Sequence, residues 1–315
     1  DVERYIRQDR IIGKRVLNFV SSQGCPHRCG YCSEVSSYHC KWKAMTAQRM
    51  IEAVHGLVEK FNLDGIKFYD SNFFVDCKRV VEFAQGLIGR GVDIGWAASA
   101  HPKDVKRLSN DFALLKKSGL RRILIGAESG SQLSLDYIKK GCTTEDIMYA
   151  AKICAMHNIS ATFTFIVGIP GTPDDVNATL GMALKLKRMS GDFDVTIHFY
   201  APLPGTPLYE EAKSQGYNPP NSLAGWSEYN YYAVQIPWLN KVTEKKVRMF
   251  SDFYSDFLYP PSWFLAKLNS MPVAKVVYRA LRSLAMLRFK LNFYHFPIER
   301  YWIESLLGKN MLKRS

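Results

Sequence analysis

The 315-residue sequence has no run of about 18 apolar residues, so it predicts no membrane-spanning helix. Its first residues lack a signal-peptide pattern and an initiator Met, and we expect the chain to be a processed or excised piece of something longer. The chain has seven cysteines, an odd number. No disulfide-like spacing is seen among four of them, Cys40, Cys77, Cys142 and Cys154. This pattern favours a reducing cytoplasm, and scattered buried thiols rather than an auxiliary cluster.

Acidic residues are scarce toward the C-terminus. Residues 241–315 carry 14 Lys and Arg against 5 Asp and Glu, so they hold +9 of the net charge of +13. Such a balance is typical of a protein with an acidic partner, which is a nucleic acid, a phosphorylated substrate or an anionic membrane surface. The alternative is a solvated face that only confers solubility.

Three thiols near the N-terminus, Cys25, Cys29 and Cys32, have the spacing C-x3-C-x2-C. They follow an apolar run, residues 16–20, that is typical of a buried strand. Thiolates are the standard ligands of iron–sulfur clusters, and three of them leave one iron of a four-iron cluster open for a substrate or cofactor. Gly30 lets the backbone curl around such a cluster.

A zinc site is the alternative for this loop. Its fourth ligand would be His27, His39 or Cys40. Structural zinc sites usually pair two short cysteine or histidine motifs, and the sequence offers no second pair. The spacing therefore favours the iron–sulfur cluster.

Strand-like runs alternate with helical patterns, which predicts parallel βαβ units. Six repeats do not close an eight-stranded barrel, so we predict an α/β fold with a partial (β/α)6 TIM-type barrel, an open lateral mouth and a mostly helical C-terminal extension. We expect a lead-in at 1–14, the barrel at 15–204 and a basic, aromatic-rich region at 205–315. The expected strands cover residues 16–20, 65–70, 93–98, 122–126, 161–168 and 195–200, and the expected helices 46–61, 77–88, a segment ending near 118–119, 144–157 and 174–189.

A basic helical pattern follows the barrel. Lys275, Arg279 and Arg282 share one face of an expected helix, and apolar residues lie toward the other. This pattern predicts either a membrane-surface helix or a helix that packs on the barrel. A peripheral membrane association of a cytoplasmic protein is therefore one of our expectations.

The C-x3-C-x-aromatic-C loop after the first strand resembles the radical S-adenosylmethionine superfamily. In that family the open iron binds the amino and carboxylate groups of S-adenosylmethionine, and one electron cleaves the sulfonium to give a 5′-deoxyadenosyl radical. The resemblance implies a [4Fe–4S] cluster on Cys25, Cys29 and Cys32, with Tyr31 beside the cofactor. It also implies an external electron donor of the flavodoxin or ferredoxin type.

Segments at the expected strand ends resemble the cofactor-binding segments of that family. Asp70 and Ser71 follow the second strand, where relatives bind the methionine amino group; a helix N-cap is the alternative. Glu128 and Ser129 belong to a G-x-E-S-G segment, in which Glu128 would accept hydrogen bonds from the ribose hydroxyls. Capping of the next helix is the alternative there.

Three further residues receive weaker assignments from the resemblance. Lys140 would meet the methionine carboxylate, or it is a solvated lysine. Gly168 lies in a segment that resembles the adenine-flanking one, where a glycine permits close backbone approach. His101 stands where relatives carry an arginine and is either a substrate-side acid/base or an incidental loop residue.

Residues 3–6, 199–209 and 288–299 resemble the branch of the family that carries an N-terminal cobalamin domain, although no D-x-H-x-x-G motif is present. The resemblance implies hydrogen abstraction from an unactivated carbon of a small molecule or lipid, followed by methylation from methylcobalamin, or by cyclisation or rearrangement. One alternative is a radical tRNA-modifying methylthiotransferase, which the positive charge would suit. The other is a non-catalytic, zinc-stabilised basic binding module.

Overall fold

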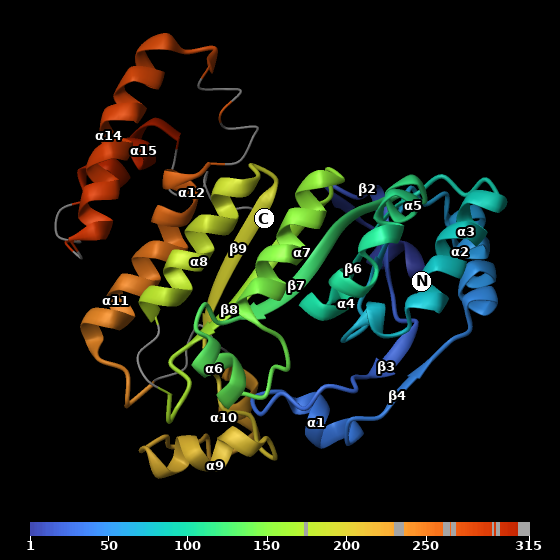
Figure 1. Cartoon of the computed structure of the whole chain (residues 1–315), viewed down its shortest axis with the longest axis horizontal. Coiled ribbons are helices and arrows are strands. Elements are labelled where there is room, and N and C mark those ends of the chain that lie inside the picture. The colour runs from blue at the N-terminus through green and yellow to red at the C-terminus, as the bar shows by residue number, and fades with distance from the viewer. Residues whose placement is uncertain are drawn as a thin grey trace.

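The computed structural model describes residues 1–172, 176–229, 236–260, 265, 269–291, 293 and 297–307. Its centre is a curled seven-stranded sheet in the order β1-β2-β5-β6-β7-β8-β9 (Figure 1). All neighbours are parallel except β1, which pairs antiparallel with β2. The predicted α/β partial barrel is therefore confirmed. The strands are β1 Arg7–Asp9, β2 Gly13–Phe19, β3 Ser22–Gly24, β4 Trp42–Ala44, β5 Gly65–Phe68, β6 Gly95–Ala100, β7 Leu120–Glu128, β8 Ser160–Val167 and β9 Phe193–Phe199.

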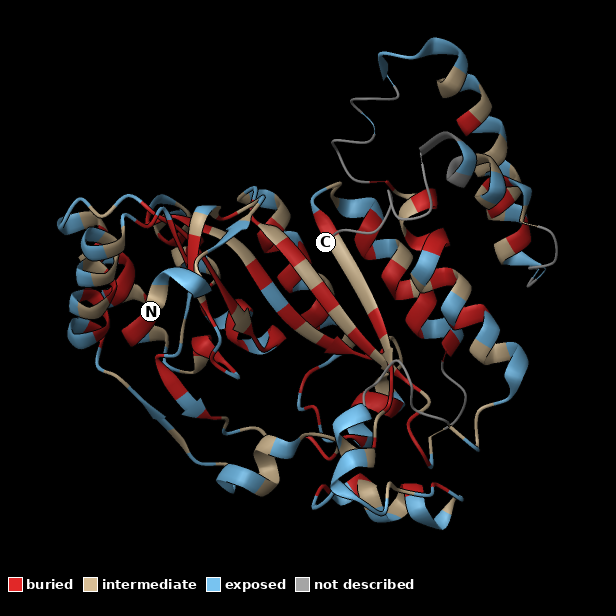
Figure 2. Cartoon of the chain, turned by 180° about the vertical axis from the view of Figure 1, so that it is seen from behind, coloured by how far each residue is buried: buried red, intermediate tan, exposed pale blue. Residues whose placement is uncertain are grey.

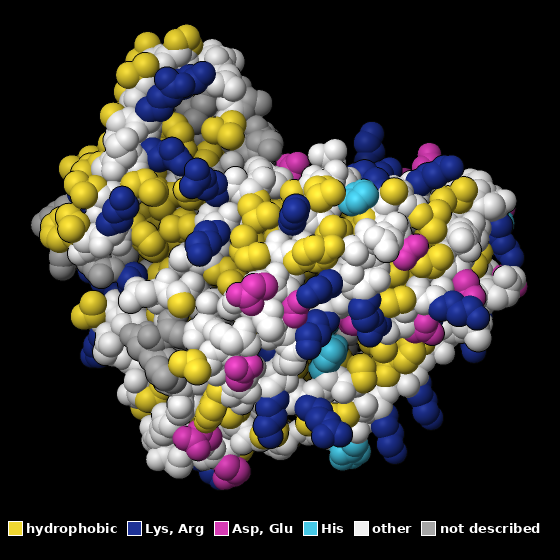
Figure 3. Space-filling view, viewed as in Figure 1, with side chains coloured by type: hydrophobic (Ala, Val, Ile, Leu, Met, Phe, Trp, Pro, Cys, Tyr) yellow, Lys and Arg dark blue, Asp and Glu magenta, His cyan; other side chains and the backbone are white. Residues whose placement is uncertain are grey.

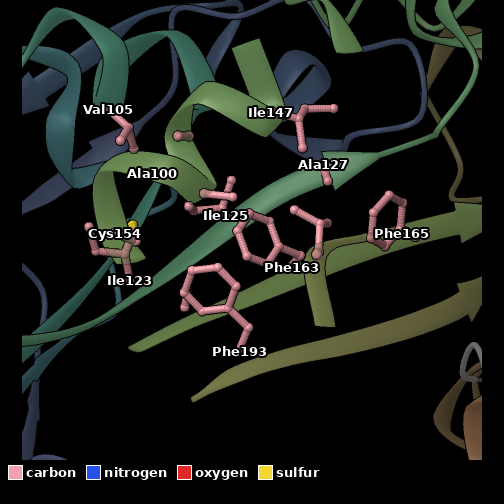
Figure 4. Packing of buried hydrophobic residues seen from close by; sticks show 14 of the residues in the cluster. Ala100, Val105, Ile123, Ile125, Ala127, Ile147, Cys154, Phe163, Phe165 and Phe193 are labelled. Carbon is pink, nitrogen blue, oxygen red and sulfur yellow. The ribbon is translucent and has the colours of Figure 1, made fainter. Parts of the chain in front are cut away.

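The sheet buries its convex face under helices and leaves its concave face half open (Figure 2). Strand β8 alternates strictly between buried and partly exposed residues along its length. Phe163 and Phe165 of β8 lie among the packed residues of Figure 4, with Ile123 and Ile125 of β7 and Ile147 of α7. This period of two keeps Thr162 and Thr164 toward the hollow of the half-barrel, where a site can form.

The helices begin where the sequence supplies caps. Thr46 caps α2, Asp76 caps α3, and Thr143 forms a reciprocal capping box with Asp146 at the start of α7. Helix α8 is described from Val176, and residues 174 and 175 of the predicted helix 174–189 lie outside the described residues. The helices around the sheet are α1 Ser33–Tyr38, α2 Ala47–Phe61, α3 Cys77–Gly89, α4 Pro102–Arg107, α5 Phe112–Lys117, α6 Gln132–Tyr137, α7 Thr144–Met156 and α8 Val176–Met189, with 3-10 turns at Val2–Tyr5, Phe73–Val75 and Ser109–Asp111.

Two features of the fold were not predicted. The lead-in contributes β1 to the edge of the sheet, and β3 and β4 form a small antiparallel hairpin around the cysteine loop. Each of these strands has three residues, too few for a hydrophobic period to be recognised.

Beyond the barrel the described chain is helical, as expected, and part of it packs against α8. Among the described residues, no helix is both long and apolar enough to cross a membrane. The divisions near residues 14 and 204 stay predictions. The elements are α9 Pro207–Ser214, α10 Leu223–Glu228, α11 Lys241–Met249, a π-helical turn Phe250–Tyr254, α12 Ser255–Leu258, α14 Pro272–Lys290 and α15 Ile298–Leu307.

Candidate active site

The cysteine loop is fixed from both sides by backbone hydrogen bonds. It leaves β3 and enters α1, with Cys32 in the N-cap position of that helix. The Gly30 amide donates to the Ile138 carbonyl at 2.8 Å, and the Gly30 carbonyl accepts from the Leu208 amide at 3.1 Å. Segments that lie more than a hundred residues away in the chain therefore hold the loop at the carboxyl end of the sheet, where the strand ends gather.

The three thiols of the loop line one cavity of about 200 Å³. Burial raises the pKa of the Cys29 thiol to about 11, and burial likewise raises the pKa of Cys25 and Cys32. Without a cation, these groups are neutral thiols at physiological pH. Binding of metal cations would supply the positive charge that deprotonates them.

Glu128 reaches this cavity through an irregular strand end. The pairing of β7 with β8 shifts between Gly126 and Glu128, and Glu128 has a left-handed φ of 63°. Such a backbone is uncommon for a non-glycine residue, and it re-aims the side chain. A Cβ at Gly126 would lie 2.8 Å from Lys140 Nζ and closer still to the Glu128 carboxylate, so the glycine makes room for both groups.

Glu128 and Lys140 form a buried ion pair, with 2.9 Å between Nζ and Oε1. The Lys140 and Glu128 side chains are 8% and 7% exposed. Burial alone lowers the pKa of Lys140, but the carboxylate outweighs it and the pKa of Lys140 is raised. Tyr31 donates its hydroxyl to the same carboxylate, and burial, with that charge, raises the pKa of Tyr31 well above its usual value. The carboxylate is therefore held in place by two partners beside the thiols.

Asp70 lines the cavity as well, but its carboxylate already has several partners. It accepts hydrogen bonds from the Ser21 amide at 2.8 Å, the Ser21 hydroxyl at 2.6 Å and the Ser22 hydroxyl at 2.5 Å. These bonds fasten the end of β5 to the strand that leads into the cysteine loop. Binding of the methionine amino group by Asp70 and the adjacent Ser71, which also lines the cavity, stays a prediction.

The buried guanidinium of Arg79 contacts the same hydrogen-bond network of Asp70 and Ser21. It lies 4.0 Å from the Asp70 carboxylate and donates to the Ser21 hydroxyl and, at 2.9 Å, to the Met45 carbonyl. No sequence motif points to Arg79. The available signal was a basic residue on the face of α3 that otherwise carries buried residues such as Val80 and Phe83.

We expect Arg79→Met to lower the free energy of unfolding by about 3 kcal/mol, because it leaves the Asp70 carboxylate buried without its counter-charge. Lys78→Met is the matched control, since the Lys78 side chain is 85% exposed, and it should change stability by less than about 0.5 kcal/mol. Urea unfolding of both variants measures the difference. Equal stabilities would show that Arg79 does not hold Asp70 in place.

His101 lines the same cavity, and its ring nitrogens are used in structural contacts. It caps α4 by accepting at Nδ1 from the Lys103 amide, and its Nε2 lies 2.9 Å from the Lys140 carbonyl, which can only accept. Its ring stacks on His27 with centroids 3.9 Å apart. Burial, followed by the Lys140 charge, lowers the pKa of His101 to about 3, so the ring is neutral and both nitrogens are engaged. Asp104 adds a third possible ligand atom to these two histidines, but an engaged His101 is poorly placed to bind a metal.

Ser129 and Gly168 are not among the residues that line this cavity. Ser129 is fully buried, and its hydroxyl accepts from the Ser131 amide, in a cap of the following turn. Gly168 has a φ of 73°, its carbonyl accepts from the Trp238 indole at 3.0 Å, and a Cβ there would lie 2.9 Å from Ile236. Cofactor contacts of these two residues stay predictions.

A second cavity of about 740 Å³ adjoins the first and fills the hollow of the half-barrel. The two share Asp70, Ser99 and Leu124 in their walls. The larger cavity has an ion pair between Arg122 and Asp9, 2.5 Å apart, and is bordered by residues of the π-helical turn and α12. It is a space of mixed polar and apolar lining that adjoins the cavity of the thiols.

Residues 19–183 match the family model of the Radical SAM superfamily. The chain belongs to the radical SAM superfamily. This family implies a [4Fe–4S] cluster and S-adenosylmethionine. The chain is 30% identical over 195 residues to an uncharacterized methyltransferase of Pyrococcus horikoshii. The aligned region covers 61% of this radical SAM chain and 41% of that protein.

This radical SAM chain is also similar to two proteins that are longer than it is. It is 24% identical over 200 residues to the anaerobic magnesium-protoporphyrin IX monomethyl ester cyclase of Rubrivivax gelatinosus, covering 64% of this chain and 35% of the cyclase. The structure of the cobalamin-dependent S-adenosylmethionine radical enzyme OxsB with aqua-cobalamin bound matches with a TM-score of 0.61 at 16% identity, over 94% of this chain and 50% of that chain. This radical SAM chain thus spans half or less of the length of each of these proteins.

Proposed function

We propose that this chain cleaves S-adenosylmethionine reductively at a [4Fe–4S] cluster held by Cys25, Cys29 and Cys32, and then abstracts hydrogen from an unactivated carbon. The observation that carries the proposal is that the three thiols line one cavity together with the Glu128–Lys140 pair. When bound, the cluster and S-adenosylmethionine supply the electron and the carbon radical for this chemistry. The protein binds, orients and excludes water.

The donor set of the cavity fits a cluster better than zinc. Among the three candidates for a fourth zinc ligand, only His27 lines the cavity, and its ring is stacked on His101. His39 is exposed and Cys40 is partly buried, and neither of them lines the cavity. Among the described residues no fourth cysteine lines the cavity, and three thiols suit a cluster with one open iron.

Glu128 and Lys140 offer opposite charges for the two ends of S-adenosylmethionine. The Glu128 carboxylate would accept hydrogen bonds from the ribose hydroxyls, and the Lys140 ammonium would meet the methionine carboxylate. Both side chains are already fixed by their mutual bond and by Tyr31, so little ordering remains when the cofactor binds.

We assign the substrate, a small molecule or lipid, to the 740 Å³ cavity beside the thiols. Its walls carry both signs of charge, including Lys67 and Asp252, so a polar portion of the substrate would be bound there. Methylation is the favoured outcome, because a relative is described as a methyltransferase and OxsB as cobalamin-dependent; cyclisation or rearrangement is the alternative. Cobalamin would then carry the methyl group, and an external flavodoxin or ferredoxin would supply the electron.

Anaerobic reconstitution followed by addition of S-adenosylmethionine and dithionite tests this function. We expect 5′-deoxyadenosine to form. With methylcobalamin and a suitable substrate we expect a methylated product, and S-adenosylhomocysteine as well once S-adenosylmethionine remethylates the spent, reduced cobalamin. The products are separated by liquid chromatography. An intact cluster that gives neither product would contradict the proposal, and 5′-deoxyadenosine without any methylated product from candidate substrates would favour cyclisation or rearrangement.

A further inference from the structure

We propose that helix α14, Pro272–Lys290, docks the chain onto an anionic lipid surface. This helix belongs to a lobe with α15 that stands at one end of the molecule, beyond α11 and α12 (Figure 1). The inference goes beyond the radical chemistry and does not depend on it.

One face of α14 is used to hold the helix on the rest of the chain. Tyr278 and Ala285 are buried, and the Tyr278 hydroxyl donates to the Phe257 carbonyl at 2.8 Å. Arg282 donates to the Leu258 carbonyl at 2.7 Å, and Arg288 lies 3.4 Å from Glu299 of α15. The orientation of α14 is thus fixed by residues on its inner side.

The opposite face of α14 is apolar and exposed. Four apolar residues on this face are more than half exposed: Val273 (79%), Val276 (65%), Leu287 (52%) and Leu291 (67%), which lies just past the end of the helix. Their spacing of three, eleven and four residues places them on one side of a helix with 3.6 residues per turn. Scattered exposed apolar residues are ordinary, but four on one side of one helix, two near each of its ends, form a stripe that marks an interaction surface.

The charge of α14 indicates which partner fits this stripe. The 19 residues of the helix include five Lys and Arg and no Asp or Glu, and three of the five, Lys275, Arg279 and Lys290, are not among the residues that hold its inner side. Figure 3 shows yellow hydrophobic side chains beside dark blue Lys and Arg on this lobe. A groove of about 260 Å³ on the helix brings Lys290 beside the apolar Met286 and Leu287. An apolar stripe with basic residues along its side suits a helix that lies in the lipid interface, where cations meet the phosphates.

A second copy of this chain fits the stripe less well. Two copies that paired through identical faces would bring two sets of basic side chains together without an acidic residue of α14 to offset them. A lipid surface of negative charge removes this repulsion and covers the apolar stripe. Electrostatic attraction and burial then act in the same direction.

Co-sedimentation with sucrose-loaded vesicles tests the proposal on the complete 315-residue chain. We expect binding to phosphatidylcholine/phosphatidylserine (7:3) vesicles to be at least tenfold tighter than to pure phosphatidylcholine vesicles, and to weaken as salt is raised. The double variant Val276→Asp/Leu287→Asp should lose at least tenfold in affinity for the mixed vesicles. It removes the stripe while leaving the inner face of α14 intact.

The matched control is Leu223→Asp/Met156→Asp, which changes the net charge equally at two apolar residues that are 89% and 63% exposed elsewhere. It should bind within about twofold of the unaltered chain. Thermal unfolding checks that both variants are folded. Equal losses in the two double variants, or no preference for the anionic vesicles, would overturn the proposal. So would a dimer of the unaltered chain that the stripe variant converts to a monomer, since the occupant would then be a second copy.

Discussion

Cys29→Ala abolishes the release of 5′-deoxyadenosine from the reconstituted chain, with a decrease of at least about 100-fold expected from the loss of a metal ligand. Cys29 is the most buried of the three loop thiols, and the Cys32 amide donates to its carbonyl at 3.1 Å. The alanine keeps this backbone bond and removes only the sulfur. Liquid chromatography of the reaction mixture measures the product.

Cys77→Ala is the control for this substitution, because Cys77 lies at the start of α3 and outside both cavities of the site. It should retain the activity of the unaltered chain. Normal 5′-deoxyadenosine release by Cys29→Ala would refute the ligand assignment. Loss in both variants would point to general damage to the fold instead.

Glu128→Gln and Lys140→Met should each lower the free energy of unfolding by about 3 kcal/mol, because each leaves one buried charge without its partner. The double variant should recover much of that loss, which is the signature of direct coupling. Since the pKa of Lys140 is raised on folding, the contribution of the Lys140 charge to stability is fully present below the unfolded lysine pKa of about 10.4. It is lost only as the pH rises through the folded pKa.

The exposed pair Lys213–Glu210, at 2.9 Å, provides the control cycle. The same substitutions there should change stability by less than about 1 kcal/mol. Urea unfolding at pH 7 gives the stabilities, and equilibrium dialysis with S-adenosylmethionine gives a second readout. Additive single effects at Glu128 and Lys140 would contradict a coupled pair.

Six of the seven strands of the sheet were predictable, because apolar runs alternate with amphipathic helices along the sequence. The start of α7 at residue 144 was also predicted, and the structure shows that Thr143 and Asp146 form a reciprocal cap there. The short strands β1, β3 and β4 carry no such pattern. They exist because the sheet edge and the cysteine loop offer them partners, which is information that only the folded chain contains.

The site was predictable only in part, and for a physical reason. Spacing reveals which residues are candidates, but it does not show how a bulge turns Glu128 toward Lys140 or how Arg79 reaches Asp70. These contacts join residues 12 and 9 positions apart through turns whose backbone the sequence does not encode locally. Likewise, the pattern of α14 predicted an amphipathic helix, but only the structure shows that its apolar face is exposed.

Analysis of iron and acid-labile sulfide after anaerobic reconstitution tests the central claim most directly. The account predicts about four iron and four sulfide per chain, and a change in the electron paramagnetic resonance spectrum of the reduced protein when S-adenosylmethionine is added. Stoichiometric zinc without labile sulfide, or a complete cluster whose spectrum S-adenosylmethionine leaves unchanged, would contradict it.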